Sequence, residues 1–301
     1  MKTKTAREVL REMQNELAQF GIENAKQEAE ILFFHCMHWS KTQYIQNETT
    51  EISEVNLHQL DAFLLERKNR KPLQYILGQW EFMGLPFSVG EGVLIPRQDT
   101  ELLVETILSF EKEFHKIEAE AEAGAVAVAV TGLDLGTGSG CIPISLAHHG
   151  KFQMSAVDIS ATALTYSQKN AVALGVDIAF YEGDLFGGLP QSQKNTFSFI
   201  VSNPPYIRSD IIPTLMEEVK DFEPTLALDG GADGLLFYER IIDEAPQWLC
   251  KGGWLFFEIG HDQGEDVFRL MEQRGFSRCE VKKDLNGLDR VVLGQFLNKL
   301  S

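Results

Sequence analysis

Hydrophobic residues recur every three or four positions through the first seventy residues, which is the spacing of helices with one buried face. The pattern predicts helices over residues 4–20 and 24–39, separated by Gly-Ile-Glu-Asn, and a third over residues 56–68. His35, Cys36 and His38 lie in the second helix without another cluster of ligand residues, so we expect no metal site there. Residues 1–73 are therefore expected to form a small helical domain.

After residue 73 the pattern changes to that of a β-hairpin. Aromatic and branched residues surround Met83-Gly84, and we assign residues 74–92 to a hairpin linker between two domains. A helix is then predicted to start at Asp99-Thr100, with Glu101 in its first turn. The charged, low-complexity residues 111–125 are interpreted as the tail of that helix and a solvated linker, in preference to a functional acidic tail.

Strand and helix patterns alternate through the rest of the chain. Strand patterns end near Gly136, Asp158, Asp184, Asn203 and Glu258, with helical patterns between most of them. This alternation predicts an α/β fold, a doubly wound and mostly parallel sheet with helices on both faces, in a domain of residues 93–301. The last two strand patterns, at 277–284 and 289–296, are separated by too few residues for a crossover helix. We therefore expect them to pair antiparallel at the sheet edge, which makes seven strands.

The charge of the chain weighs against a duplex nucleic acid as its partner. The net charge is −17; residues 1–90 carry 10 Lys and Arg against 12 Asp and Glu, and residues 91–301 carry 17 against 32. A protein that binds a phosphate backbone normally presents a basic stripe, and none is visible here.

The four cysteines lie far apart, and neither a signal-peptide core nor an apolar stretch of membrane-spanning length occurs. We expect reduced thiols, a cytoplasmic location, no membrane association and a monomer.

A glycine-rich turn follows the strand that ends at Leu135. Gly136, Gly138 and Gly140, with Thr137 and Ser139 between them, precede a predicted helix. Glycines allow a tight turn and close approach of a ligand, although such a turn alone is weak evidence for a binding site. Asp158 ends the next strand, 20 residues after Gly138, where a carboxylate can bind both hydroxyls of a ribose. The alternative for Asp158 is a helix cap, a role that Ser160 fills more naturally.

The residues around this turn favour S-adenosylmethionine over a nicotinamide cofactor. Asp134 precedes the first glycine by two positions, where it would repel a pyrophosphate but attract an ammonium or sulfonium group. At the third strand end, Asp184 is placed to accept a hydrogen bond from an adenine amino group, with Leu185 as an apolar neighbour. The alternative for Asp184 is a cap of a turn.

Asn203-Pro204-Pro205-Tyr206 follows the fourth strand, at the edge of the sheet where the glycine-rich turn is also expected. A planar amino or amide nitrogen is a poor nucleophile because its lone pair is delocalised. The Asn203 side-chain oxygen and the Pro204 carbonyl can accept its two N–H groups and orient it towards a methyl donor. Two prolines restrict that carbonyl, and Tyr206 can pack against a flat acceptor.

These motifs resemble a known family. Leu-Asp-Leu-Gly-Thr-Gly-Ser-Gly, Ala-Val-Asp-Ile-Ser and Ser-Asn-Pro-Pro-Tyr are similar to amino-directed, S-adenosylmethionine-dependent methyltransferases. The segments Lys-Pro-Leu-Gln-Tyr-Ile-Leu-Gly, Leu-Ile-Pro-Arg-Gln-Asp-Thr-Glu and Phe-Glu-Pro-Thr-Leu-Ala-Leu-Asp-Gly-Gly narrow the resemblance to the release-factor glutamine N5-methyltransferase family. The resemblance runs over nearly the whole chain.

The resemblance implies a class I methyltransferase-like fold and an activity. The family methylates the glutamine of the Gly-Gly-Gln motif in bacterial class I peptide-chain release factors, so residues 1–73 would recognise that protein substrate. It implies cofactor contacts at Gly136–Gly140, Asp158, Leu185 and Asn203. Some members of the family carry tryptophan at the position of Leu185. It implies that Pro204, Pro205 and Tyr206 shape the glutamine slot. The roles of three further residues stay open. Arg97 and Glu101 either take part in the site or form an ion pair at the domain interface. Glu258 either lines the pocket or caps a helix.

Three other functions fit the sequence less well than glutamine methylation. Asn-Pro-Pro-Tyr also occurs in nucleic-acid amino methyltransferases of the N6-adenine type, which the acidic C-terminal two thirds of the chain disfavours. A non-catalytic S-adenosylmethionine-binding protein would not need an intact Asn203-Pro-Pro-Tyr206. A dehydrogenase is disfavoured by Asp134 and by the lack of a Tyr-x-x-x-Lys pair.

Overall fold

The computed structural model describes residues 4–121 and 129–297, and these divide into two compact units. The first unit comprises Met1–Gln79 together with Met216–Phe222, and the second comprises Trp80–Leu215 and Glu223–Ser301. No local pattern indicated that a segment from the C-terminal half would join the N-terminal helices.

The first unit is a cluster of helices. The three helices expected from the hydrophobic spacing are present, and among the described residues three shorter ones accompany them. The Thr5 side chain accepts a hydrogen bond from the Glu8 backbone and the Glu8 carboxylate returns one to Thr5, a capping box that defines the first helix start. The helices are α1 (Ala6–Gln19), α2 (Ala25–Met37), α3 (Lys41–Asn47), α4 (Glu54–Lys68), α5 (Leu73–Leu77) and, from the later segment, α10 (Glu217–Lys220).

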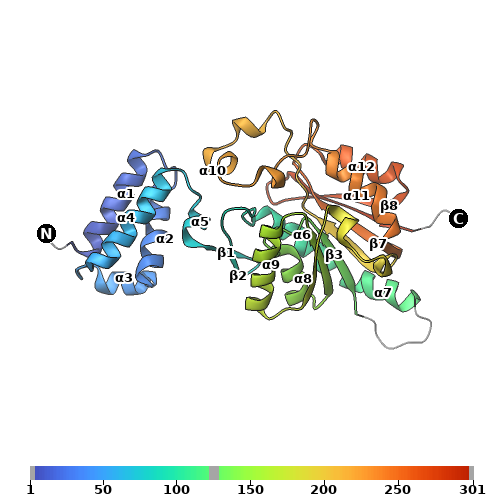
Figure 1. The fold of residues 1–301 in the computed structure, drawn as a ribbon, viewed down its shortest axis with the longest axis horizontal. Coiled ribbons are helices and arrows are strands. Elements are labelled where there is room, and N and C mark those ends of the chain that lie inside the picture. Colours follow the sequence, from blue (N-terminus) through green and yellow to red (C-terminus); the bar gives the residue numbers. More distant parts are fainter. Residues whose placement is uncertain (1–3, 122–128, 298–301) are drawn as a thin grey trace. The chain divides into compact units, whose positions relative to one another are not determined.

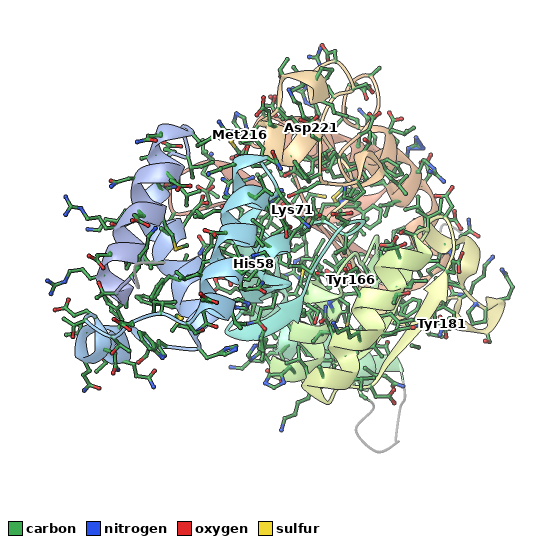
Figure 2. All side chains as sticks on the ribbon, turned by 60° about the vertical axis from the view of Figure 1, so that its left-hand side comes forward. His58, Lys71, Tyr166, Tyr181, Met216 and Asp221 are labelled. Atoms are coloured by element: carbon green, nitrogen blue, oxygen red, sulfur yellow. The ribbon has the colours of Figure 1, made fainter. Side chains whose placement is uncertain are left out.

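A buried arginine attaches α10 to the other helices of this unit. Arg67 Nε lies 2.6 Å from Glu28 on α2, and its Nη1 lies 3.1 Å from Glu218 on α10. Met216 and Asp221, labelled in Figure 2, flank α10 on either side. A guanidinium removed from water is stable only when its charge is compensated, and these two glutamates provide that compensation for Arg67.

The predicted hairpin is confirmed as β1 (Gln79–Phe82) and β2 (Leu85–Ser88). Met83 and Gly84 form its turn with φ angles of 52° and 73°, the left-handed conformation that a two-residue hairpin turn requires. Glu101 accepts a hydrogen bond of 2.7 Å from the Met83 amide. The carboxylate of Glu101 therefore supports the turn.

The second unit is built on a seven-stranded sheet with the order β5-β4-β3-β6-β7-β9-β8. Neighbours from β5 to β7 are parallel, and β9 pairs antiparallel with both β7 and β8. The expected doubly wound sheet with an antiparallel pair at its edge is confirmed. The strands are β3 (Thr131–Leu135), β4 (Gln153–Asp158), β5 (Ile178–Glu182), β6 (Phe197–Ser202), β7 (Leu249–Glu258), β8 (Phe276–Lys283) and β9 (Asp289–Phe296).

Helices cover both faces of this sheet (Figure 1). One apolar core joins one face to the helices α6 to α9, and a second joins the other face to α11 and α12. Because the central strand β6 is buried throughout, it separates the two cores. The helices are α6 (Asp99–Ser109), α7 (Glu111–Ala121), α8 (Cys141–His149), α9 (Ala161–Leu174), α11 (Leu236–Glu244) and α12 (Gly264–Gln273).

The interpretation of residues 111–125 as a helix tail and solvated linker is wrong for the part that the structure describes. The helix that begins at Asp99 ends at Ser109, and α7 is a separate helix. Phe114 and Ile117 of α7 are buried in the core, at the i, i+3 spacing that charged neighbours obscured in the sequence. Residues 122–125 lie outside the described residues.

Replacing Phe199 by Ala is expected to destabilise the second unit strongly. The Phe199 ring lies on β6, is fully buried and stacks on Phe114 at 4.8 Å between ring centroids. Its loss leaves a cavity, and we expect the free energy of unfolding to fall by about 3–5 kcal/mol. Urea unfolding followed by tryptophan fluorescence measures this loss. Leu285→Ala, at a fully exposed position, is the control and should change it by about 0.5 kcal/mol or less.

Candidate functional site

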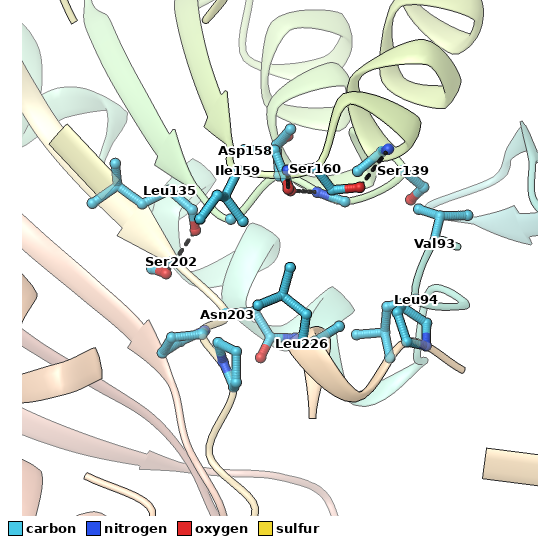
Figure 3. A pocket seen from close by; sticks show the side chains of 18 of the residues that line it. Val93, Leu94, Leu135, Ser139, Asp158, Ile159, Ser160, Ser202, Asn203 and Leu226 are labelled. Carbon is cyan, nitrogen blue, oxygen red and sulfur yellow. Dashed lines mark hydrogen bonds between the residues drawn. The ribbon is translucent and has the colours of Figure 1, made fainter. Parts of the chain in front are cut away.

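A cavity of about 310 Å³ lies in the second unit at the carboxyl ends of β3, β4 and β6 (Figure 3). This volume is at the lower end of the range for ligand pockets. The lining combines an apolar wall with the predicted cofactor and acceptor segments. Residues that line it include Val93, Leu94, Ile95, Arg97, Thr100, Gly136, Thr137, Gly138, Ser139, Asp158, Asp184, Leu185, Asn203, Pro204, Pro205, Leu226 and Arg240.

The glycine-rich turn reaches the cavity with only part of its length. Gly136 and Gly138 line it with φ angles of 74° and 56°, which permit the chain to turn directly after β3. Gly140 does not line the cavity. A Cβ at Gly140 would lie 2.9 Å from both Ile144 and Ser167, so this glycine permits close packing of α8 on α9.

Asp134 lies in β3 beneath the turn and outside the cavity lining. It is fully buried, and neither carboxylate oxygen has a hydrogen-bond partner among the described residues. Burial raises the pKa of Asp134 to about 7; the nearby Thr137 hydroxyl, which does not reach hydrogen-bond geometry, lowers it, and Asp158 raises it further. An uncompensated buried carboxyl next to a pocket fits a ligand that brings a positive charge, and the role of Asp134 towards such a ligand stays a prediction.

Asp158 holds the turn and faces the cavity. Its Oδ2 accepts a 2.8 Å hydrogen bond from the Gly138 amide. Its Oδ1 accepts one of 2.8 Å from the Ser160 amide (Figure 3). Burial raises the pKa of Asp158, and these backbone hydrogen bonds lower it. Ser160 caps α9 by accepting a hydrogen bond from Ala163. Each carboxylate oxygen keeps lone-pair capacity, so the backbone bonds leave ribose binding possible.

The third predicted cofactor segment, Asp184 and Leu185, also lines the cavity. The Asp184 carboxylate forms an ion pair with Arg240 of α11, at 2.7 Å. Leu185 adopts a φ of 51°, an uncommon conformation outside glycine, which directs the chain into a short 3₁₀ turn. The sequence did not indicate Arg240, because its partner lies 56 positions away. The contact of Asp184 with adenine stays a prediction.

The predicted acceptor segment follows β6 directly. Asn203, Pro204 and Pro205 line the cavity, whereas Tyr206 does not. Asn203 Nδ2 lies 3.3 Å from the Thr100 hydroxyl of α6, to which it donates. Because Nδ2 points towards Thr100, the opposite end of the carboxamide, Oδ1, is directed away from it.

Two further residues fix the end of the acceptor segment. Gln263 Nε2 donates to the backbone carbonyls of Tyr206, at 3.1 Å, and of Gly234, at 3.2 Å. A Cβ at Gly230 would lie 2.7 Å from Tyr206 Cα and 2.8 Å from the Pro205 carbonyl oxygen. The loop that contains Gly230 therefore packs directly against the backbone of the acceptor segment. Gly230 stands in one of the segments that carry the family resemblance, but the sequence pattern assigned neither residue to the site.

The structure also places the three residues whose roles were open. Arg97 lines the cavity and binds Glu223 at 2.6 Å, a carboxylate whose pKa burial raises and Arg97 lowers. Glu101 supports the hairpin turn and is not part of the lining. Glu258 is buried at the end of β7 and also lies outside the lining.

Among the described residues, no three or more His, Cys, Asp or Glu side chains are grouped so that they could hold a metal ion. Within the same part of the chain, no helix combines the length and apolar character needed to cross a membrane.

The strand order and the glycine-rich turn with Asp158 define a class I methyltransferase fold. The family models "PrmC N-terminal domain" and "Methyltransferase small domain" match residues 8–78 and 121–219. The chain is 39% identical to the release factor glutamine methyltransferase of Geobacter sulfurreducens, over 97% of this chain and 96% of that protein. It is 41% identical to that of Flavobacterium psychrophilum, over 82% and 83%. The chain belongs to the release factor glutamine methyltransferase family.

One solved structure supports the fold alone. The hMettl16 catalytic domain in complex with the MAT2A 3'UTR hairpin 6 superposes with a TM-score of 0.53 at 14% identity. The match covers 83% of this chain and 84% of that chain.

Replacing Gly230 by Ala is expected to displace the acceptor segment. The new Cβ would meet backbone atoms, which cannot rotate away, so we expect the free energy of unfolding to fall by about 1–3 kcal/mol. Hydrogen exchange of the amides around Tyr206 should become faster. Gly187→Ala is the matched control, because a Cβ there meets nothing within 4 Å. Equal exchange in both variants would contradict the packing described here.

Proposed function

We propose that this chain transfers a methyl group from S-adenosylmethionine to the side-chain nitrogen (N5) of a glutamine, the one in the Gly-Gly-Gln motif of class I peptide-chain release factors. Family membership supports the reaction and the protein substrate. The observation that carries the proposal is that the glycine-rich turn and Asn203-Pro204-Pro205 line one cavity. A methyl donor on the turn and an amide beside Asn203 would then share a single cavity.

The residues of the turn would hold the cofactor, which supplies an electrophilic methyl group on a sulfonium. The Gly138 and Ser139 backbone, with Asp158, would bind the ribose side, and Leu185 would give apolar cover to the adenine. Asp134 would compensate a positive charge of the cofactor from beneath the turn, which accounts for a carboxyl without partners.

The acceptor segment would orient the glutamine amide. Asn203 Oδ1 and the Pro204 carbonyl would accept its two N–H groups, so that the nitrogen lone pair faces the methyl carbon. The N–C bond forms as the S–C bond breaks, the nitrogen becomes cationic, and one of its protons leaves to solvent. No base is needed before the attack, because the proton becomes acidic only afterwards. Pro205 and Tyr206 would shape the slot.

The domain roles follow as part of the same proposal. Residues 1–73 would recognise the release factor, residues 74–92 would connect the domains, and residues 93–301 would carry catalysis, in a monomeric cytoplasmic enzyme. The match of the PrmC N-terminal domain to residues 8–78 supports a distinct helical module.

Incubation of the chain with radiolabelled S-adenosylmethionine and a purified release factor tests the proposal. We expect label on the glutamine of Gly-Gly-Gln, located by mass spectrometry, and a turnover lowered by about 10²–10³ in Asn203→Ala. Asn286→Ala, at an exposed position of the turn after β8, is the matched control and should retain full turnover. Label on DNA or RNA in preference to the release factor would refute the proposal and favour a nucleic-acid amino methyltransferase.

Binding of S-adenosylmethionine is expected to depend on pH through Asp134. The pKa of this carboxyl is about 7, so it is neutral well below pH 7 and ionised above it. A cationic ligand favours the ionised form, and we expect the affinity to rise by about tenfold between pH 6 and pH 8. Isothermal titration calorimetry measures this change.

Asp134→Asn should weaken binding at pH 8 and remove the pH dependence. Asp177→Asn, at an exposed aspartate, should behave like the unchanged protein. An unchanged pH dependence in Asp134→Asn would assign the titration to another group.

A further inference from the structure

Glu258 is a buried glutamate next to the proposed acceptor segment, and it has no direct part in the proposed methyl transfer. It is the last residue of β7, a strand that runs parallel to β6. Ser202 pairs with Phe257 across these strands. Asn203 and Glu258 are the next residues along the two strands, so the sheet register brings them side by side.

The carboxyl of Glu258 has unused hydrogen-bonding capacity. Glu258 is 1% exposed, and its Oε2 is buried without a hydrogen-bond partner among the described residues. Thr100 and Asn203 are the polar side chains whose approach lowers its pKa through hydrogen bonding. A buried carboxylate oxygen without a partner is costly, so its retention beside Asn203 calls for a role.

The position of Glu258 matters because a carboxamide has two unlike ends. Asn203 accepts a substrate N–H only when Oδ1 faces the acceptor slot, and Nδ2 must then face the protein. In the reverse orientation, Nδ2 would present hydrogens to the hydrogens of the glutamine amide. Thr100 alone holds Nδ2 through one hydrogen bond of 3.3 Å, and its hydroxyl could equally donate to Oδ1. A carboxylate cannot donate, so it distinguishes the two orientations.

The surrounding charges leave Glu258 able to ionise near neutral pH. Burial raises the pKa of Glu258 to about 7, and the negative charge of Asp99 on α6 raises it as well. Hydrogen bonding to Thr100, the positive charge of Arg290 on β9 and hydrogen bonding to Asn203 lower it. Arg290 is shared, because it lies 3.1 Å from Asp99 and 3.3 Å from Asp284. The other titratable neighbours, Tyr206, Tyr238 on α11 and Cys141 on α8, have pKa values raised by burial and by Glu258, so they stay neutral at pH 7.

We propose that Glu258 is a positioning residue: its carboxylate accepts the second N–H of Asn203 Nδ2 and locks Oδ1 towards the glutamine amide. This inference rests on the proposed function. Catalytic hydrogen bonds often tighten only when the substrate is bound, and the free Oε2 provides the capacity for this one.

The ionisation of Glu258 then controls the orientation of Asn203. The deprotonated carboxylate accepts from Nδ2, whereas the protonated carboxyl can donate to Oδ1 and stabilise the reversed, unproductive carboxamide. The turnover number kcat should therefore rise with pH through about 7 and level off above it. Asp134 also titrates near 7, but it acts on the cofactor, so at saturating S-adenosylmethionine its effect disappears from kcat and stays in KM.

The experiment measures kcat and KM between pH 5.5 and pH 9 with release factor and saturating radiolabelled S-adenosylmethionine. We compare the unchanged protein with Glu258→Gln, a nearly isosteric change that removes the titration and restores the ambiguity of the Asn203 carboxamide. We expect Glu258→Gln to lower kcat by about 10- to 100-fold at pH 8 and to flatten its pH profile, with KM for the cofactor within about threefold. Glu280→Gln, on β8, is the matched control and should keep the profile of the unchanged protein.

The possible results separate this inference from the function on which it rests. An unchanged protein that fails to label the release factor contradicts the proposed function itself. An active protein whose kcat is independent of pH around 7, or a Glu258→Gln variant with the same kcat profile, contradicts only the role of Glu258. If Glu258→Gln loses affinity for S-adenosylhomocysteine in calorimetry as strongly as it loses kcat, Glu258 supports the fold and the inference is refuted.

Discussion

One hydrogen bond joins the two halves of the proposed active site. The Ser202 hydroxyl, buried at the end of β6, donates to the Leu135 carbonyl at the end of β3, at 2.7 Å (Figure 3). The next residue on β3 is Gly136, the start of the glycine-rich turn, and the next on β6 is Asn203. The parallel register of β3 and β6 therefore fixes the distance between the cofactor segment and the acceptor segment. Both segments begin where their strands end, at the carboxyl edge of the sheet, which is where ligands bind in folds of this kind.

Two buried carboxyl groups lie at the carboxyl edge of the sheet, and their burial costs stability. Asp134 and Glu258 are both fully buried carboxyls with a pKa of about 7. Since their pKa is near 4 in the unfolded chain, the native state binds more protons between pH 4 and pH 7. The free energy of unfolding therefore falls as pH rises through that window. A fold under selection for stability alone would not retain such groups, and both lie next to segments that we assign to ligands.

Local patterns in the sequence sufficed for the sheet and for much of the site. The alternation of strands and helices predicted a mostly parallel sheet, although not the order of its strands. Met83-Gly84 predicted the hairpin, and the strand ends located Asp158 and Asn203. Each of these depends on neighbours within a few residues. The interpretation of residues 111–125 failed because the two buried residues of α7 are embedded among charged ones.

Pairs formed by residues far apart in the chain could not be predicted in this way. Arg240 meets Asp184, Glu223 meets Arg97, and Glu218 brings α10 to Arg67 in the first unit. An ion pair leaves no periodic trace in the sequence, and its partner is decided by the fold. Gln263 and Gly230 were missed for the same reason, since they act on the backbone of Tyr206 from distant loops.

The proposed reaction depends on geometry, because two acceptor oxygens must point at one amide nitrogen. A crystal structure of the protein with S-adenosylhomocysteine and a peptide that contains Gly-Gly-Gln tests it most directly. We predict the glutamine side-chain nitrogen at about 3 Å from both Asn203 Oδ1 and the Pro204 carbonyl oxygen, facing the cofactor sulfur. A glutamine bound with its carbonyl towards Asn203, or outside the cavity, would contradict the account.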